Sequence, residues 1–167
     1  MLIRAINPSD WDGIVDLLGR TDAFDDEERQ VARELVDDAI HRSAATGYAA
    51  LVAVESDMSG GPVMGYVLYG PTPMTEHTYD LYWIAVDANR RGQGIGRKLV
   101  TALDEVLHKE GGRIIRVEAS SVADAPATLA FYEGTGFIEC GRIPHFYRTD
   151  DALVMFYRDL GAATARH

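Results

Sequence analysis

The sequence predicts one α/β domain, residues 1–167, built on a mixed and mostly antiparallel β-sheet with helices on both faces. The chain has 167 residues, of which 47% are hydrophobic, and this is enough to bury one compact core. Strand-like and helix-like patterns follow one another in the order β-α-α-β-β-β-α-β-α-β-β. Hairpins near the start require antiparallel pairs, and a strand-helix-strand unit in the middle requires a parallel pair, so one sheet contains both.

The first three elements are a strand and two helices. Residues 2–6 form a short apolar run, and Asn7 followed by Pro8 is typical of a capped helix start. Helical spacing then predicts a first helix from Trp11, Ile14, Val15 and Leu18. A second helix begins in the acidic stretch 25–28, where negative charge suits the helix dipole, and its apolar face contains Val31, Leu35, Val36, Ala39 and Ile40. The acidic stretch has a second interpretation, as one wall of a site for a cationic substrate.

The remaining elements alternate between β-rich runs and helical patterns. Runs of β-branched and aromatic residues predict strands at residues 48–55, 62–69, 78–86, 113–119, 136–142 and 152–158. Residues 56–61 have the composition of a hairpin loop. Helices are predicted at residues 126–134 and at residues 91–110, and the latter helix ends at Gly111 and Gly112.

Composition disfavours several classes of partner. The formal net charge is -10, which disfavours nucleic-acid binding because neutralising phosphates needs positive charge. The N-terminus lacks a signal-peptide core and no run of about 18 apolar residues occurs, so we expect no membrane contact and a cytoplasmic location. The single cysteine, Cys140, excludes an intramolecular disulfide, and its place in a predicted strand favours a buried, inert thiol. The histidines lack metal-ligand spacing, so we expect no metal.

A glycine loop is the strongest local signal. A strand ending in Ile84, Ala85 and Val86 leads to the loop and then to a helix; the loop reads Arg91-Gly92-Gln93-Gly94-Ile95-Gly96. Glycines let the backbone approach an anion, and the helix adds the positive end of its dipole. The spacing fits neither a P-loop nor a dinucleotide-binding fingerprint. We predict a site for a compact pyrophosphate, bracketed by Arg90, Arg91, Arg97 and Lys98. The alternative is a tight turn with solvated arginines.

Two motifs in this chain resemble those of the GNAT acetyltransferase family. The loop is similar to the family's Arg/Gln-x-x-Gly-x-Gly/Ala motif. Further along, the family's Phe-Tyr-x-x-x-Gly-Phe pattern resembles Phe131-Tyr132-Glu133-Gly134-Thr135-Gly136-Phe137. The resemblance implies that acetyl-coenzyme A binds with its pyrophosphate on residues 91–96. Its pantetheine arm would lie along the backbone of Ile84 and Val86, inserted like a strand between two diverging strands.

The resemblance also implies an acid and an oxyanion donor for acetyl transfer. Tyr132 matches the family tyrosine that donates to the coenzyme A sulfur, and a phenol can hydrogen-bond a developing thiolate. Outside this motif, a core tyrosine with a satisfied hydroxyl would be the simpler interpretation. The oxyanion donor is expected to be the backbone N–H near Ala85 or Val86.

Two carboxylates are candidates for the base that deprotonates the amine. Asp80 comes first, and strand alternation places it on one face with Tyr82, Ile84 and Val86 unless a bulge reverses the facing. Glu118, near the end of the next strand, comes second. For either residue the alternative is a solvated or ion-paired carboxylate.

Two further segments are tied to the predicted site with less support. The family often has asparagine where this chain has Ala125, so Asp124 or Ser121 is expected to take over that contact with the pantetheine arm. The predicted loop between the last two strands either walls the acceptor site or forms a packed aromatic turn, through His145, Phe146 and Tyr147.

The predicted function is direct transfer of acetyl from acetyl-coenzyme A to a primary amine of a small molecule, because the chain is short and acidic. Acetylation of a protein N-terminus or lysine is the alternative within the same chemistry. Two alternatives without catalysis are a module that senses acetyl-coenzyme A and a domain whose acidic helices bind a partner protein. The resemblance also implies a homodimer formed through the last strands.

Overall fold

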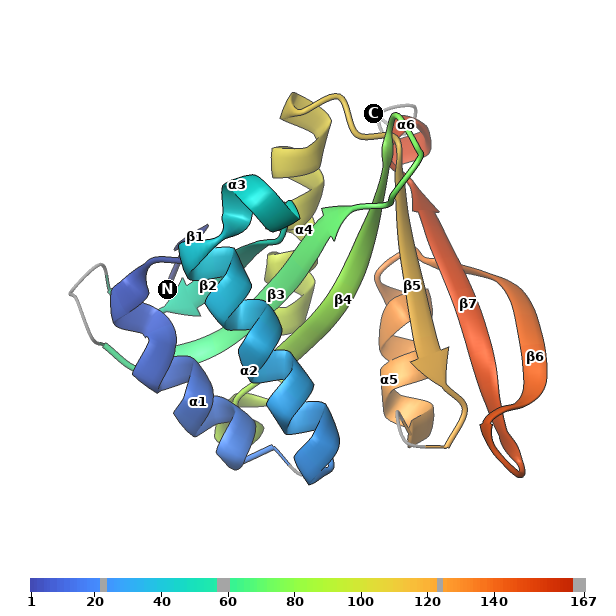
Figure 1. Cartoon of the computed structure of the whole chain (residues 1–167), viewed down its shortest axis with the longest axis horizontal. Coiled ribbons are helices and arrows are strands. Elements are labelled where there is room, and N and C mark those ends of the chain that lie inside the picture. The colour runs from blue at the N-terminus through green and yellow to red at the C-terminus, as the bar shows by residue number, and fades with distance from the viewer. Residues whose placement is uncertain (22–23, 57–60, 123–124, 164–167) are drawn as a thin grey trace.

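The computed structural model describes residues 1–21, 24–56, 61–122 and 125–163 (Figure 1). Its described strands form one seven-stranded sheet in the order β1-β2-β3-β4-β5-β7-β6. Every neighbouring pair is antiparallel except β4 and β5, which are parallel. The predicted mixed, mostly antiparallel sheet is therefore confirmed. Its strands are β1 (Leu2–Ala5), β2 (Ala49–Val54), β3 (Val63–Pro71), β4 (Thr78–Val86), β5 (Ile114–Ser120), β6 (Ile138–Arg148) and β7 (Asp151–Asp159).

Helices cover both faces of the sheet (Figure 1). On one face lie η1 (Pro8–Asp10), α1 (Trp11–Gly19), α2 (Asp26–His41) and α3 (Ser43–Thr46). On the other lie α4 (Ile95–Lys109) and α5 (Ala125–Gly134). The short elements η2 (Ala88–Arg90) and α6 (Leu160–Ala163) precede α4 and follow β7. The order of strands and longer helices is the predicted one.

Two apolar cores lie on opposite faces of the sheet. The core under α1 and α2 contains fully buried side chains such as Leu17, Val36 and Tyr66. The core under α4 and α5 contains Leu103 and Phe156. Burying one such leucine side chain stabilises the fold by roughly 1.5–3 kcal/mol before the entropy of ordering is counted. The helical stripes expected from the sequence therefore hold each helix against its own face.

The sheet opens between β4 and β5. These two strands pair only through Thr78–Asp80 opposite Ile114–Arg116. Beyond that point they diverge (Figure 1), while β4 stays paired with β3 as far as Val86 and β5 stays paired with β7 as far as Ser120. The divergence leaves a wedge in which each strand has one edge without a neighbouring strand among the described residues.

A β-bulge at Tyr82 changes which side chains share a face of β4. Opposite β3, Leu68 pairs with Trp83 and Tyr69 pairs with Leu81, so Tyr82 is an extra residue. One inserted residue reverses the alternation of side chains.

The expected facing of Asp80 therefore holds for Tyr82 and is wrong for Ile84 and Val86, which lie beyond the bulge that the prediction left open. Ile84 and Val86 pack on the α4 core together with Leu81, whereas Tyr82 packs on the α1 and α2 core. Asp80, adjacent to Leu81 in the strand, faces the α1 and α2 side.

Two predicted boundaries need correction. Helix α4 begins at Ile95 and not at residue 91, because Gly92 and Gly94 have φ of +78° and +75°, outside the right-handed helical region. Strand β6 continues to Arg148, so the segment expected as a loop lies within a strand.

Cys140 on β6 is exposed, contrary to the expectation of a buried thiol, because β6 is the edge strand and both of its faces are largely open to solvent. Asp124 and most of the predicted loop 56–61 lie outside the described residues.

Candidate functional site

The N-terminus of α4 is arranged to receive an anion. Gly94 occupies the N-cap position, no side chain of the described residues caps it, and the first turn has no acidic residue. A Cβ atom built at Gly92 or Gly94 would meet nothing within 4 Å, so open space lies against the loop. The first-turn N–H groups of a helix have no partner within the helix, and the dipole adds positive charge there. Arg91 is exposed beside them.

Helix α2 begins in the opposite way. Asp25 accepts a hydrogen bond from the backbone N–H of Glu28, the Glu28 side chain accepts one from the backbone N–H of Asp25, and the first turn contains three acidic residues. This capping box satisfies the helix start from within the chain. The contrast indicates that α4, and not α2, has a start left open for an external anion.

The residues of the predicted loop divide into two groups. Arg91, Gly92, Gln93 and Gly94 form the exposed connection itself. The other two, Ile95 and Gly96, hold α4 in place together with the adjacent Arg97. Ile95 is 3% exposed in the core. A Cβ at Gly96 would come within 3.0 Å of the Phe131 ring. Arg97 donates from Nη1 to the carbonyl oxygen of Gly134 at 2.9 Å.

Two ion pairs hold the segment that leads into this loop. Arg90 Nη2 lies 2.6 Å from Glu55 Oε1 at the end of β2, and Arg20 Nη2 lies 3.4 Å from Asp87 Oδ2. Asp87 also accepts a hydrogen bond from the backbone N–H of Asn89. Sequence inspection missed these pairs, because partners so far apart in the chain leave no local pattern.

Tyr132 lies on the same face of the sheet as the loop. It is 6% exposed, and its ring centroid lies 5.5 Å from that of Phe137 and 5.6 Å from those of Phe131 and Phe156. Its helix, α5, lies beside the opening between β4 and β5 (Figure 1). The wedge thus has the glycine loop and Tyr132 on one side of the sheet.

An arginine anchors the C-terminal end of α5. Arg158 on β7 donates from Nη1 to the carbonyl oxygen of Thr135. The same guanidinium binds Asp104 on α4 through Nε at 3.1 Å and Nη2 at 2.5 Å. Because these bonds tie α5 to both α4 and β7, the position of Tyr132 is set by three elements.

A charged cluster lies on the opposite face. Asp80 is 6% exposed and accepts a 2.6 Å hydrogen bond from Arg116 Nε. Nη1 of the same arginine lies 3.4 Å from Glu118 Oε1. The hydrogen bond to Asp80, with the charges of both carboxylates, raises the pKa of Arg116. Burial first, and then the charge of Asp80 and the hydrogen bond that Tyr82 donates to it, raise the pKa of Tyr82 to about 12.

This cluster lines a small hollow of about 170 Å³, bounded by Asp80, Leu81, Tyr82, Arg116, Glu118 and Tyr147. Sequence analysis selected Asp80 and Glu118 but missed Arg116. The sequence feature that could have identified Arg116 is the alternation along β5. There the exposed residues Arg116 and Glu118 alternate with the buried residues Ile115, Val117 and Ala119.

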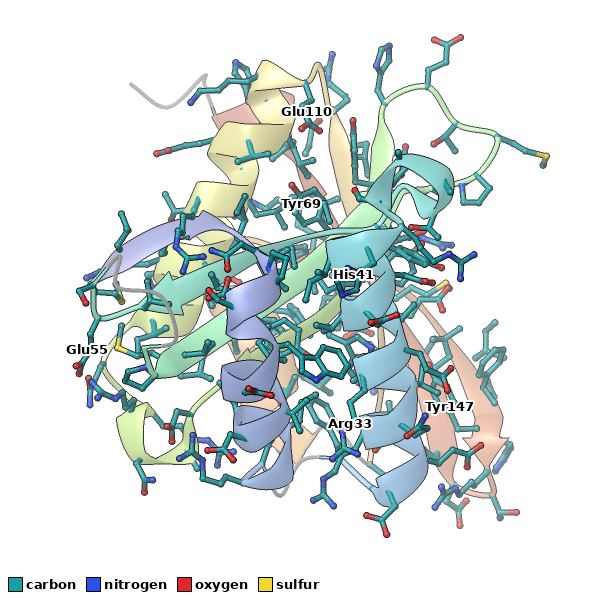
Figure 2. All side chains as sticks on the ribbon, turned by 60° about the vertical axis from the view of Figure 1, so that its left-hand side comes forward. Arg33, His41, Glu55, Tyr69, Glu110 and Tyr147 are labelled. Carbon is teal, nitrogen blue, oxygen red and sulfur yellow. The ribbon has the colours of Figure 1, made fainter. Side chains whose placement is uncertain are left out.

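Strand β6 contributes the outer wall of the hollow. Tyr147 lines it, while Phe146 stacks edge-on against Tyr147 with ring centroids 5.0 Å apart. His145 accepts a hydrogen bond from the backbone N–H of Asp150 and is not among the lining residues. Figure 2 labels Tyr147 in the view in which α1 and α2 lie at the front. The next residue, Arg148, forms an ion pair with Asp25 at the start of α2, with 3.7 Å between Arg148 Nη2 and Asp25 Oδ2. Of the three aromatic candidates, the structure brings one to the carboxylates.

A larger, open hollow of about 580 Å³ lies along α2, where Figure 2 labels Arg33. None of its lining residues belongs to β4, β5 or the glycine loop, so it contains none of the predicted chemistry. No helix in the described part of the chain is both long and apolar enough to cross a membrane. Within the same residues, no three His, Cys, Asp or Glu side chains are grouped to hold a metal ion.

Comparison with known sequences places this geometry in context. The model of the acetyltransferase (GNAT) family matches residues 11–137, which include the glycine loop and Tyr132. The chain is 36% identical over 97 residues to the N-alpha-acetyltransferase RimI of Mycobacterium tuberculosis, a match that covers 56% of this chain and 57% of that protein. It is 36% identical over 105 residues to the uncharacterized N-acetyltransferase YhbS of Escherichia coli K12, a match that covers 60% of this chain and 56% of that protein. The chain thus spans little more than half of these curated relatives.

Solved structures extend the similarity over nearly the whole chain. A putative acetyltransferase of the GNAT family from Desulfovibrio desulfuricans has 36% identity and a TM-score of 0.88, covering 95% of this chain and 98% of that one. An aminoglycoside 6'-N-acetyltransferase complexed with coenzyme A has 20% identity and a TM-score of 0.72, covering 96% and 97%. At that identity the second match shows the shared fold alone.

Proposed function

Because the chain belongs to the acetyltransferase (GNAT) family of acyltransferases, we propose that it transfers the acetyl group of acetyl-coenzyme A directly to a primary amine of a small molecule. The observation that carries this proposal is the uncapped start of α4 beside the β4–β5 wedge. Open space, exposed main chain and an exposed arginine at that point suit a pyrophosphate. The free edges of β4 and β5 suit an extended arm that pairs with backbone.

On the coenzyme side, we assign the pyrophosphate to the loop residues Arg91, Gly92, Gln93 and Gly94 and to the first-turn N–H groups of α4. The pantetheine arm would run along the backbone of Ile84, Ala85 and Val86. The N–H near Ala85 or Val86 would stabilise the oxyanion, an interaction worth roughly 2.7–4 kcal/mol in other acyl-transfer enzymes. Ile95, Gly96 and Arg97 would act through packing, because their contacts are with the core and α5.

Each proposed step has a residue to move its proton. Glu118 accepts a proton from the ammonium group, and the freed amine nitrogen attacks the thioester carbonyl carbon. A carbon–nitrogen bond forms, the carbon–sulfur bond breaks, and the departing thiolate takes a proton from the hydroxyl of Tyr132. The nitrogen then loses its second proton to solvent, and solvent returns a proton to the Tyr132 oxygen, so that a neutral amide and a free thiol remain. The wedge lets these residues act from opposite faces of the sheet, because the arm would lie between the two strands.

The surroundings of the two carboxylates favour Glu118 over Asp80 as the base. Asp80 is nearly buried and is held by Arg116 and Tyr82, so an incoming amine has little access to it. The side chain of Glu118 is 43% exposed, and its one ion pair with the described residues is the 3.4 Å approach of Arg116 Nη1. An accessible carboxylate can reach the amine directly or through one water. Asp80 would then position Arg116.

The small hollow supports an acceptor that inserts only its reacting end. Its volume of about 170 Å³ is below the roughly 300–1,000 Å³ typical of pockets that enclose a drug-sized ligand. Acetylation of a protein N-terminus is the second candidate, because relatives with matching sequences include ribosomal-protein-alanine N-acetyltransferases and an open hollow admits a chain end. A cytoplasmic location and a homodimer through β6 and β7 stay predictions.

Two glycine variants test the coenzyme site. Gly94 and Gly111 stand at opposite ends of α4 with φ of +75° and +80°, and a Cβ at either would meet nothing within 4 Å. Alanine at either position should therefore cost a similar roughly 1–2 kcal/mol of folding stability. Saturating acetyl-coenzyme A should raise the melting temperature of the wild type and Gly111→Ala by several degrees, and that of Gly94→Ala much less.

Thiol release against a panel of amines, measured on the same samples, tests the transfer itself. Arg91→Glu, at an exposed position, should weaken the thermal shift with little change in stability without coenzyme. Equal shifts in the two glycine variants would remove the loop from the site, and no shift in the wild type would contradict the proposed function.

A further inference from the structure

The guanidinium of Arg116 is fixed at one side and open at the other. Its Nε binds the buried carboxylate of Asp80 at 2.6 Å, while 44% of the arginine side chain is exposed. Among the described residues, the one other charged contact of this guanidinium is the 3.4 Å approach of Nη1 to Glu118. A guanidinium held by Nε keeps the Nη edge, which matches planar oxygen acceptors bidentately.

Arg116 and Glu118 present opposite charges on one face of β5. They are two residues apart in the strand, which separates their Cα atoms by roughly 6–7 Å. Both line the same hollow as the two tyrosines, Tyr82 and Tyr147. Arg116 offsets the charge of Asp80, so one carboxylate charge is left for an ammonium group. The hollow therefore complements a group that has both an amine and an oxygen acceptor within a few atoms.

We propose that Arg116 is a specificity-determining residue that selects acceptors bearing a carboxylate or amide carbonyl on the carbon next to the amine. This inference rests on the proposed transferase function and narrows its acceptor class to α-amino acids and α-amino amides. The carboxylate or carbonyl oxygen binds the Nη edge of Arg116 while the amine faces Glu118. A polycationic acceptor gains less, because its second charge lies near a guanidinium that is already positive.

Matched acceptor sets test this selection. Each set shares one carbon skeleton, as in phenylalanine, phenylalaninamide and phenethylamine, or alanine, alaninamide and ethylamine. Thiol release gives kcat/KM for each member, and the free acid and the amide distinguish a carboxylate from a carbonyl as the bound group. α-Amino amides also have less basic amines than alkylamines, which by itself favours them at neutral pH. The decisive quantity is therefore the change in the preference ratio between wild type and Arg116→Gln.

We expect Arg116→Gln to lower the ratio of kcat/KM for the α-substituted amine to kcat/KM for the unsubstituted amine by about 10- to 100-fold. This is the change expected from the loss of one charge-assisted hydrogen bond. Arg116→Lys should restore part of the ratio, because it keeps the charge and loses the planar fork. Truncating Arg116 alone orphans the buried Asp80, so the double variant Asp80→Asn/Arg116→Gln is measured in parallel. A general loss of folded protein lowers all acceptors equally and leaves the ratio unchanged.

Three results would overturn the inference. The first is an unchanged kcat/KM ratio in Arg116→Gln and in the double variant Asp80→Asn/Arg116→Gln. The second is a wild-type preference for unsubstituted amines or polyamines, and the third is no turnover of any α-substituted amine. In the first two cases thiol release continues, so the transferase function stands and the selection by Arg116 fails. If acetyl-coenzyme A does not shift the melting temperature of the wild type, the proposed function fails first.

Discussion

At the β4–β5 wedge, the two faces of the sheet present different chemical groups, main chain on one face and side chains on the other. On the α4 side, the proposed anion site consists of main chain: two glycines with positive φ, an uncapped helix start and strand edges. On the α1 and α2 side, the site consists of side chains from three strands, Asp80 on β4, Arg116 and Glu118 on β5, and Tyr147 on β6. Main chain suits a ligand shared by a whole family, because any sequence with the right glycines can supply it. Side chains suit a ligand specific to this protein.

The largest expected effect is on the coenzyme face, at Tyr132. Removing its hydroxyl in Tyr132→Phe should lower kcat about 10²- to 10⁴-fold, since the leaving thiolate loses its proton donor. The melting-temperature shift with acetyl-coenzyme A should persist, because binding depends on the loop. Stopped-flow and steady-state thiol release measure the loss.

Tyr79→Phe is the matched control for that experiment. Tyr79 lies where β4 and β5 are still paired, on the closed side of the wedge, and its hydroxyl interacts with Glu110. Its turnover should equal that of wild type. If Tyr132→Phe retained the wild-type kcat, Tyr132 would not be the proton donor, and the residues on the coenzyme face would serve in binding alone.

On the acceptor face, the two carboxylates should separate stability from activity. Glu118→Gln should lower kcat by about 10²-fold or more at neutral pH. Its stability should change by no more than about 0.5 kcal/mol, because Glu118 is exposed. Asp80→Asn should lower stability by about 1–3 kcal/mol through its weakened bond to Arg116. Urea unfolding and kcat are measured on both variants. The assignment of Glu118 as the base would be contradicted if Asp80→Asn alone abolished turnover while keeping the wild-type stability.

The smallest expected effect is an alkaline loss of stability that involves both faces. The pKa of Tyr82 on the acceptor face and of Tyr69 on the coenzyme face is raised to about 12, in both cases mainly by burial. Figure 2 shows Tyr69 near Glu110, whose charge adds to the rise. Unfolded tyrosine ionises near pH 10, so between about pH 10 and 12 the unfolded state binds fewer protons and stability falls as pH rises.

Urea unfolding at pH 9 and pH 11 measures this fall. Tyr69→Phe and Tyr82→Phe should each make the fall in the free energy of unfolding smaller, by a fraction of the roughly 1.4 kcal/mol per pH unit that corresponds to one proton. The effect should be smaller for Tyr82→Phe, because Tyr82 is more exposed. An identical fall in both variants and in wild type would show that other groups cause it.

Local patterns predicted most of the fold and supply the glycine loop of the proposed site. The apolar spacing of α1, α2 and α4, the cap at Asn7, the acidic start of α2 and the glycines before α4 all act within a few residues of one another. Two of the errors arose where a neighbouring strand decided the outcome. The bulge at Tyr82 is visible only in the register with β3, and the exposure of Cys140 follows from the edge position of β6.

The sequence by itself determined the elements, their order and the glycine loop that we assign to the coenzyme, because helix spacing, strand alternation and glycine φ are local properties of the chain. Only the tertiary structure decided which side chains line the proposed acceptor site. Arg116 meets Asp80 across the parallel pair of β4 and β5, and Tyr147 on the edge strand β6 lines the same hollow. Residues that are far apart in the chain come together there through sheet register and burial, and a buried carboxylate requires the partner that the fold supplies.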